Sequence, residues 1–475
     1  MHLAELCKGS TPDSDSVCEG SNPSSAAISP QAYVLLAAFF YDLTMRIAIF
    51  DPDMAETFRV RNFYNFLAAD AAWRIIMKLL VCNVGSTSLK FKLYEMPEER
   101  VYCRAGVERV GSADSAIFTY KNEESGCSVR LEGQSVPEYR SGISMFLKTA
   151  LEDAALPLND INEIEAVGFK TVLSKGYYGV HELDENVIQG MRDFLYIAPV
   201  HNSAYLSAVG QFRELLPHTP LIGVFETAFH TTIPPERSIY PVPYEWYEKY
   251  GIKKLAYHGA SHEYISEQSA KYGENRRVIS CHLGGSCSVC AILDGGSVDS
   301  SFGFSLQTGV FHANRCGDID PYIIPFLLNE GMSIDEVLDG LSKNGGLLGI
   351  SGVSNDLRLV MQAADSGNAR AKLAVDAFVC SIVRFIGMFY AELGGLDQLV
   401  FTGGIGEHSA EIRSRVCSAV SHMGVVIDES RNSKVEKGVI TRADSPVKAV
   451  VIPANEELGI ARKSYRYISE KGMCK

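Results

Sequence analysis

Two hairpins with one plan occupy residues 80–93 and 279–293 of this 475-residue chain. The first, LVCNVGSTSLKFKL, runs from an apolar strand through one polar residue and a turn of glycine and serine into a second strand. The second, ISCHLGGSCSVCAIL, repeats that order and continues into DGGSV (294–298), an Asp-Gly hairpin signal. A repeated supersecondary unit indicates duplicated domains that face each other.

Strand and helix patterns alternate along the chain from Met77 onward, which is typical of α/β layers. A helix that starts at a Ser cap and ends at a glycine is one of these patterns. The sequence predicts strands over 164–173, 220–227 and 398–404, and helices over 185–198, 260–273 and 371–395.

The glycine turns suit a phosphate ligand, because consecutive backbone N–H groups in such turns bind anions. Ser86, Thr87, Ser88 and Ser286 add hydroxyl donors. A third loop, TGGIGEHSAEIRSRV (402–416), leads from a strand through glycines into a helix, as if a nucleotide lay at the helix N-terminus. Neither a P-loop nor a Rossmann fingerprint is present, so the hypothesis is a nucleotide held by a different arrangement.

Charged residues cluster beside these turns. Arg315 lies in NRCGDIDP, Glu226 ends a predicted strand, and Glu456 and Glu457 follow another. Two histidines in AYHGASHEY (256–264) leave a zinc site open as an alternative, although the H-E-x-x-H pattern is missing. A lone C-x-x-C, Cys287 with Cys290, lacks the second Cys/His pair that a metal site needs.

Composition narrows the class of protein. The chain is 46% hydrophobic and 21% charged, as soluble globular proteins are, and its length predicts two or three domains. A net charge of -13 argues against a nucleic-acid or anionic-membrane surface. Twelve cysteines without paired spacing predict free thiols in a reducing compartment, and we expect a cytoplasmic protein.

Residues 1–76 differ from the rest. Residues 1–31 have a disordered composition, and the apolar stretch 32–41 is shorter than the ~20 residues of a membrane span. We interpret 1–76 as an extension without catalytic use or as the product of an upstream start codon, with a functional domain as the alternative.

Together these stretches resemble the acetate kinase (acetokinase) family over about Met77 to Tyr467. The motifs that carry the resemblance stand in family order: NVGSTSLKF, APVHN, VFETAFH, YHGASH, HLGGSCSV, GDIDP, GLLGISGVSNDLR, FTGGIGEHSAEIR and IPANEELGIAR. The resemblance implies two duplicated actin-like, sugar-kinase-like (ribonuclease H-like) domains with a cleft between them. It implies domain I over 77–226, joined by a C-terminal helix over about 458–475, and a nucleotide-binding domain II over 227–457.

The resemblance also implies an ATP- and Mg²⁺-dependent carboxylate kinase that makes acetyl phosphate or a related acyl phosphate, and that is a homodimer. Phosphoryl transfer needs positive groups and a metal around spreading negative charge. The implied roles are Asn83 and Glu456 for Mg²⁺; Lys170, Glu226, His258 and Arg315 for catalysis; Ser86, Ser88 and Lys90 for a phosphate turn; His282, Gly284, Gly285, Ser286, Asp356, Leu357, Arg358, Gly404, Ile405 and Gly406 for the nucleotide; and Lys170, Val172, Val200, Tyr257 and Leu306 for the acceptor.

The chain departs from the family pattern mainly in the acceptor half. Lys170 and Glu226 replace an arginine and an aspartate, and Phe169 replaces a histidine. Gly285 stands for an asparagine. Val200, Tyr257 and Leu306 replace a leucine, a phenylalanine and a proline, while Val172 is kept. The alternative function is therefore a nucleotide-binding paralogue, a regulator, whose acceptor chemistry is lost or redirected.

Overall fold

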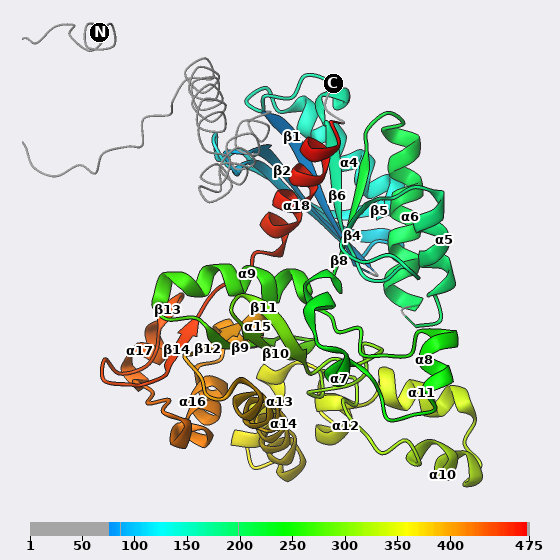
Figure 1. The fold of residues 1–475 in the computed structure, drawn as a ribbon. Coiled ribbons are helices and arrows are strands. Elements are labelled where there is room, and N and C mark those ends of the chain that lie inside the picture. The colour runs from blue at the N-terminus through cyan, green and yellow to red at the C-terminus, as the bar shows by residue number, and fades with distance from the viewer. Residues whose placement is uncertain (1–75, 86, 198, 473–475) are drawn as a thin grey trace, which may run out of the picture. The chain divides into compact units, whose positions relative to one another are not determined.

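The computed structural model describes residues 76–472 except Ser86 and Ala198, and of residues 199–201 it describes the backbone only. The described residues belong to one compact unit and are drawn in colour in Figure 1. The predictions for residues 1–75 lie outside the described residues. Two sheets, each covered by helices, make up the described unit (Figure 1).

The first sheet has eight strands in the order β5-β4-β3-β2-β1-β6-β8-β7. Its first five strands form an antiparallel meander, and β1, β6 and β8 run parallel. Nearly every residue of β6 and β8 is buried, as expected for parallel strands covered on both faces. The strands are β1 (Met77–Gly85), β2 (Ser88–Met96), β3 (Arg100–Glu108), β4 (Ser112–Asn122), β5 (Ser128–Val136), β6 (Ala166–Thr171), β7 (Val180–Glu182) and β8 (Leu221–Phe225).

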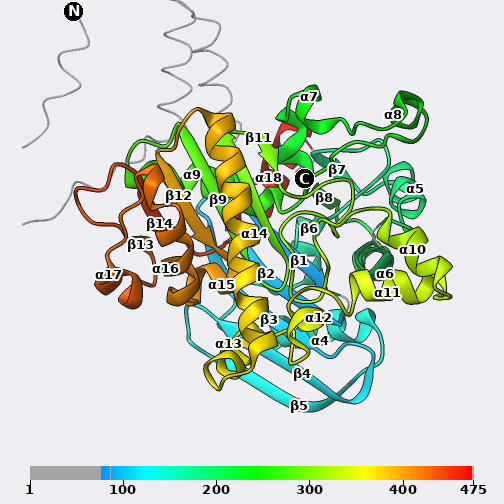
Figure 2. The ribbon, with the colours of Figure 1, turned by 90° about the horizontal axis from the view of Figure 1, so that it is seen from below.

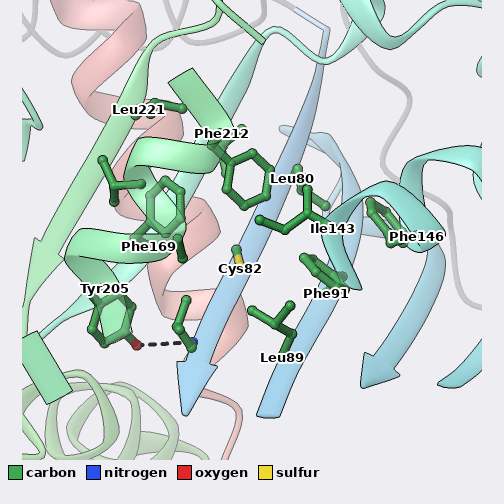
Figure 3. Packing of buried hydrophobic residues seen from close by; sticks show 14 of the residues in the cluster. Leu80, Cys82, Leu89, Phe91, Ile143, Phe146, Phe169, Tyr205, Phe212 and Leu221 are labelled. Atoms are coloured by element: carbon green, nitrogen blue, oxygen red, sulfur yellow. Dashed lines mark hydrogen bonds between the residues drawn. The ribbon is translucent and has the colours of Figure 1, made fainter. Parts of the chain in front are cut away.

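Helices cover both faces of this sheet. On one face, α4 (Tyr139–Glu152) and α6 (Pro199–Leu215) close an aromatic core, and α5 (Glu185–Asp193) packs on α6 (Figure 3). Phe169 meets Phe212 there with ring centroids 5.3 Å apart. On the other face, α18 (Glu456–Lys471) packs so closely that a Cβ on Gly168 would come 2.5 Å from Ser464 Oγ. Phe169, which stands where the family has a histidine, is therefore a core residue.

The second sheet has six strands in the order β11-β10-β9-β12-β14-β13, and β9, β12 and β14 run parallel. The helix α14 (Ala369–Leu393) runs across one face with α16 (Ala410–Ala419) beside it, and α9 (Gly259–Ser269) covers the other (Figure 2). The strands are β9 (Arg277–Leu283), β10 (Cys287–Leu293), β11 (Gly296–Ser300), β12 (Gln398–Thr402), β13 (Gly438–Val439) and β14 (Lys448–Val451).

Among the described helices, α14 is long and apolar enough to cross a membrane by length and composition alone. Its buried residues, such as Phe378 and Ile386, belong to the core beneath the second sheet, so we interpret it as a core helix. The remaining helical elements are η1 (Ile161–Glu163), η2 (Ala228–Thr232), α7 (Pro235–Ser238), α8 (Tyr244–Tyr250), η3 (Ala270–Tyr272), α10 (Ile323–Asn329), α11 (Ile334–Ser342), α12 (Gly346–Ser351), α13 (Leu357–Asp365), α15 (Gly403–His408), η4 (Ser421–Met423) and α17 (Glu429–Lys434).

The sequence predicted the repeated plan correctly. Both hairpins are present as β1–β2 and β9–β10, and the Asp-Gly turn leads into β11. The predicted strands over 164–173, 220–227 and 398–404 contain β6, β8 and β12, and the predicted helix over 371–395 is α14. The α/β fold of two actin-like halves is thereby confirmed. The domain bounds 77–226, 227–457 and 458–475 remain a proposal.

Two helix ends were predicted wrongly. The helix predicted over 185–198 ends at Asp193. The helix predicted to start at a Ser cap begins at Gly259, with His258 as its N-cap in the left-handed region at φ 59°. Gly259 is required because a Cβ there would lie 2.0 Å from the Glu226 backbone oxygen. This tight contact, which no local pattern reveals, moves the helix start.

Candidate active site

The carboxyl ends of β1, β6 and β8 bring three predicted site residues to one edge of the first sheet. Cys82 of β1 pairs with Phe169 of β6, so Asn83 and Lys170 follow side by side. Lys170 pairs with Val224 of β8, two residues before Glu226. Ligands of open α/β sheets bind at such strand ends.

Lys170 lies between two carboxylates. Its Nζ is 2.8 Å from Glu226 Oε1 and 2.7 Å from Glu456 Oε2. Burial acts to lower the pKa of Lys170, but the two carboxylates outweigh it and hold that pKa well above its usual range. Burial raises the pKa of Glu226. Burial also acts to raise the pKa of Glu456, but the attraction of Lys170, His282 and Lys90 together outweighs it and lowers that pKa. The positive charge of the Lys170 ammonium is thus balanced by two carboxylates of the protein.

Glu456 and its neighbour Glu457 follow the strand β14, as the sequence predicted, and they open α18 and lie on no extended segment. They still diverge, because successive helical residues point about 100° apart. Glu457 turns to β2, where Lys92 Nζ lies 3.3 Å from its Oε2. Of these two neighbouring glutamates, only Glu456 forms an ion pair with Lys170.

Asn83 is held by a buried tyrosine. The Tyr205 hydroxyl donates to Asn83 Oδ1 at 3.3 Å and accepts from the Val84 N–H at the same distance, the second bond being drawn in Figure 3. Tyr205 comes from α6 and carries no sequence signal of its own. This contact leaves the second lone pair of the Asn83 amide oxygen for another partner.

Three histidines gather where α9 meets β9 and β10. The rings of His258 and His282 lie with centroids 4.1 Å apart, and His262 is 6.4 Å from each. Burial, followed by neighbouring positive or ionisable groups, holds the pKa of His258 and of His262 well below the usual range, so both rings are neutral. Their nitrogens bond serine hydroxyls, and within the described residues no group of three His, Cys, Asp or Glu could hold a metal ion. The zinc alternative has no support there.

Arg315 lies in a loop shaped by glycines. Gly317 has φ 73°, and a Cβ on it would meet the Gly309 carbonyl at 2.6 Å. The Arg315 Nη1 donates to the Leu306 carbonyl at 2.7 Å. Burial lowers the pKa of Arg315, and none of the described carboxylates forms an ion pair with it. In the described part of the chain, this partly buried guanidinium therefore has no carboxylate partner.

A cavity of about 960 Å³ opens between the second hairpin turn and three helix starts. Asp356 is the N-cap of α13, and its carboxylate accepts from the Arg358 backbone N–H at 2.9 Å and from that residue's guanidinium. Seven predicted nucleotide residues line the cavity: Gly284, Gly285, Asp356, Leu357, Arg358, Gly404 and Ile405. The prediction missed other lining residues. Asn355, His408 and Glu411 belong to the same sequence motifs, and Met361, Gln362 and Asp365 lie further along α13.

Other predicted residues lie apart from this cavity. Gly406, within α15, faces Phe401 and Cys281 in the interior, and its carbonyl accepts from Arg413. His282 lies with the histidines, and the buried Ser286 hydroxyl has no partner within the described residues. Ser88 and the exposed Lys90 border a second hollow on the β2–β3 surface. Ser86 and the Val200 side chain lie outside what the structure describes.

Val172, Tyr257 and Leu306, which were predicted to bind the acceptor, are buried in one hydrophobic cluster with Phe302. The Tyr257 hydroxyl donates to the Phe304 carbonyl at 2.7 Å. This hydroxyl, which the family's phenylalanine lacks, is therefore bonded within the protein. The Tyr257 ring itself is fully buried in the hydrophobic cluster.

Comparisons with known proteins agree on one family. The sequence pattern of the acetokinase family matches residues 78–462. The chain is 41% identical to an acetate kinase of Shouchella clausii (strain KSM-K16), over 82% of this chain and 100% of that protein. It is 40% identical to the acetate kinase of Bacillus subtilis (strain 168), over 82% and 99%.

Solved structures give the same result. A Porphyromonas gingivalis acetate kinase superposes with a TM-score of 0.73 at 34% identity, covering 81% of this chain and 98% of that one. A propionate kinase from Francisella tularensis subsp. tularensis SCHU S4 gives 0.75 at 32% identity, covering 82% and 99%.

Proposed function

The chain belongs to the acetokinase family, a family of carboxylate phosphotransferases, and we propose that it transfers the γ-phosphoryl group of ATP to the oxygen of a short carboxylate. The products are an acyl phosphate and ADP. The observation that supports the proposal is the large cavity lined by glycine turns and helix N-termini. It lies in the same half of the protein as Arg315, which forms no ion pair with a described carboxylate. A coupled assay of ADP formation, with and without a carboxylate, tests it.

The cavity supports ATP as the donor. Its walls combine backbone N–H groups of glycine turns with apolar side chains such as Leu357, Met361 and Ile405, which suit a purine. The glycines of both turns let the backbone approach phosphates closely. In this arrangement the phosphates lead from the cavity toward His258 and Arg315.

The residues near Lys170 fit a magnesium ion. Asn83 and Glu456 supply the hard oxygen ligands that Mg²⁺ prefers, and water and phosphate oxygens commonly complete its shell. The carboxylates of Glu226 and Glu456 outnumber the single ammonium of Lys170, which favours an additional positive charge at this place. Bound there, Mg²⁺ would neutralise charge on the phosphates.

Arg315, His258 and Lys170 are proposed to stabilise the transferred group. Arg315 contributes a fixed positive charge, which costs no reorganisation during the reaction because the loop already holds it. The neutral His258 contributes a hydrogen bond. Lys170, held by Glu226 and Glu456, lies at the edge where the acceptor carboxylate would enter.

The alternative, a nucleotide-binding regulator with lost acceptor chemistry, is not favoured, because the named relatives are acetate and propionate kinases. ATP turnover that stays absent across a panel of short carboxylates would support the alternative.

We also propose a cytoplasmic homodimer. The nine cysteines in the described part are free thiols, as in reducing compartments. Exposed apolar side chains gather on α10 and α11, a composition typical of an interface. They are Tyr322, Ile323, Phe326, Leu328, Ile334 and Leu338. Light scattering of the purified protein tests the dimer.

Acetate is expected to be a poor acceptor with a high KM. Lys170 offers a point charge where the family has an arginine, whose guanidinium can form two parallel hydrogen bonds to a carboxylate. The two carboxylates that Lys170 contacts both belong to the protein. Loss of the fork weakens ground-state binding more than the chemical step, so KM should change more than kcat. Steady-state kinetics on acetate, propionate, butyrate and hydroxylated or amino analogues measure this preference.

The matched variant is Lys170→Arg combined with Glu226→Asp, which restores the family's pair. It should lower the KM for acetate. The idea of a redirected acceptor site is wrong if the unmodified protein already uses acetate as efficiently as typical relatives and the double variant gains nothing.

A protein starting at Met77 should fold and bind ATP as tightly as the full chain. Residues Ile75–Lys475 form one compact unit, and Met77 is itself buried in β1 opposite Met96. Calorimetric titration with ATP and a melting curve measure both properties. Weaker binding or insoluble protein after truncation would show that residues 1–76 are needed.

A further inference from the structure

A chain of buried side chains leads away from His258. Its Nδ1 lies 2.9 Å from Ser288 Oγ, and the same hydroxyl lies 2.8 Å from His262 Nε2. His262 Nδ1 in turn lies 2.9 Å from Ser280 Oγ. Ser280, His262 and Ser288 are almost completely shielded from solvent. Within the described residues, no hydrogen bond reaches His258 Nε2.

The hydrogen bonds of this chain can run in only two directions. A serine hydroxyl has one proton, and a neutral imidazole has one N–H. If Ser280 donates to His262, then His262 donates to Ser288, and Ser288 donates to His258 Nδ1. The proton of His258 is then on Nε2. If every bond is reversed, His258 Nε2 carries a bare lone pair.

His230 shows what is unusual about His258. The His230 ring bonds the Ser297 hydroxyl through Nδ1 at 2.8 Å and the Tyr257 carbonyl through Nε2 at 2.9 Å. A carbonyl only accepts, so it fixes the proton on Nε2 whatever the serine does. His258 has no such carbonyl within the described residues, and its tautomer depends on Ser288 alone.

We propose that Ser288 is a positioning residue that, through His262 and Ser280, holds His258 as the Nε2–H tautomer, ready to donate to an oxygen of the transferred phosphoryl group. The inference rests on the proposed function, because it assumes that His258 faces a phosphate. Negative phosphate oxygens select the donating direction, since a bare lone pair would repel them. Burial, followed by neighbours that include His282, Lys170 and Arg315, lowers the pKa of His258, so the ring stays neutral and can donate.

The first test reads the tautomer directly. Histidine ¹⁵N NMR of the full chain with ADP, Mg²⁺ and inorganic phosphate should show His258 as neutral with its proton on Nε2, the signal being assigned by its loss in His258→Gln. In Ser288→Ala the signal should shift toward a mixture of tautomers. An unchanged His258 signal in Ser288→Ala overturns the proposal. This NMR measurement does not require turnover. A failure of the proposed kinase reaction can therefore be distinguished from a failure of the tautomer proposal.

The second test is kinetic. Ser288→Ala should lower kcat by about 10- to 100-fold, the range typical of groups that orient a functional histidine, with little change in the KM for ATP. The matched control is Ser297→Ala, which removes the same hydroxyl from a buried histidine whose tautomer a carbonyl still fixes; its kcat should stay near that of the unmodified protein. Equal losses in both variants, or a loss that follows the melting temperature, would mean a structural role only.

Ser280→Ala is the second variant, at the far end of the chain. It should move the His258 signal in the same direction as Ser288→Ala but less, because His262 can still donate to Ser288. A His258 signal identical to that of the unmodified protein would show that the chain ends at Ser288, against the proposal.

Discussion

Arg315→Ala should lower turnover by about 10³-fold or more while nucleotide binding and the melting temperature stay nearly unchanged. An arginine that stabilises charge on a transferred phosphoryl group contributes about that much to the rate. In the described structure Arg315 pairs with no carboxylate, and its one hydrogen bond goes to the Leu306 carbonyl. Its removal therefore leaves no buried anion behind. Single-turnover kinetics, ATP titration and a melting curve separate the three effects.

A structural alternative is that Arg315 pairs with Asp318 or Asp320, which follow it in NRCGDIDP. The structure instead has Asp318 accepting from the Gly309 N–H and Asp320 from the Tyr322 N–H. A matched control is Arg413, which is buried and donates to Asn432 and to two backbone carbonyls. Arg413→Ala should unfold at lower temperature. If Arg315→Ala behaves like Arg413→Ala, stability and not catalysis explains its loss.

Glu456→Ala should abolish Mg²⁺-dependent turnover, with a loss of about 10²-fold or more, and leave the fold intact. A group that holds charge in place at the reacting centre is commonly worth that factor. Removing one partner of a buried ion pair is costly when the other charge is left alone. Here Lys170 keeps Glu226 at 2.8 Å, so the cost to stability is small. Activity measured against Mg²⁺ concentration, beside a melting curve, checks both parts.

Glu457→Ala is the control for this prediction. Its partner Lys92 is partly exposed, and such pairs contribute only about 0–1 kcal/mol. Turnover and Mg²⁺ dependence should stay close to those of the unmodified protein. Equal losses for Glu456→Ala and Glu457→Ala would contradict the assignment of the metal to Glu456.

Local chemistry explains how far the sequence could predict the site. The glycine turns and the Asp356 cap are short-range signals, and most of their residues do line the cavity. Gly406 shares the motif but faces the protein interior, because in a helical turn one glycine of the run points inward. Gln362 and His408 were missed since they differ from neighbouring helix residues only in their direction. Asn355 was missed because it precedes the α13 cap in a bend that has no local signal of its own.

Long-range contacts set the rest. No local pattern shows that Tyr205 bonds Asn83, that the Tyr257 hydroxyl donates to the Phe304 carbonyl, or that Ser288 bridges two histidines. Each of these contacts joins residues that are far apart in the chain or on different elements. Tertiary packing determines which residues become partners. The partner of a single polar residue in an apolar strand cannot be inferred from the neighbouring sequence.

By itself, the sequence determined the elements and their repeat: two strand-turn-strand hairpins, the alternation of strands and helices, and the glycines where the backbone must bend or approach closely. These depend on side-chain periodicity and backbone conformation, which act over a few residues. Only the tertiary structure decided which charges meet. Lys170, Glu226 and Glu456 come from β6, the end of β8 and the start of α18, and their pKa values follow from shared burial and mutual attraction. Electrostatic energies depend on distance and solvent exposure in space, and neither quantity exists until the chain has folded.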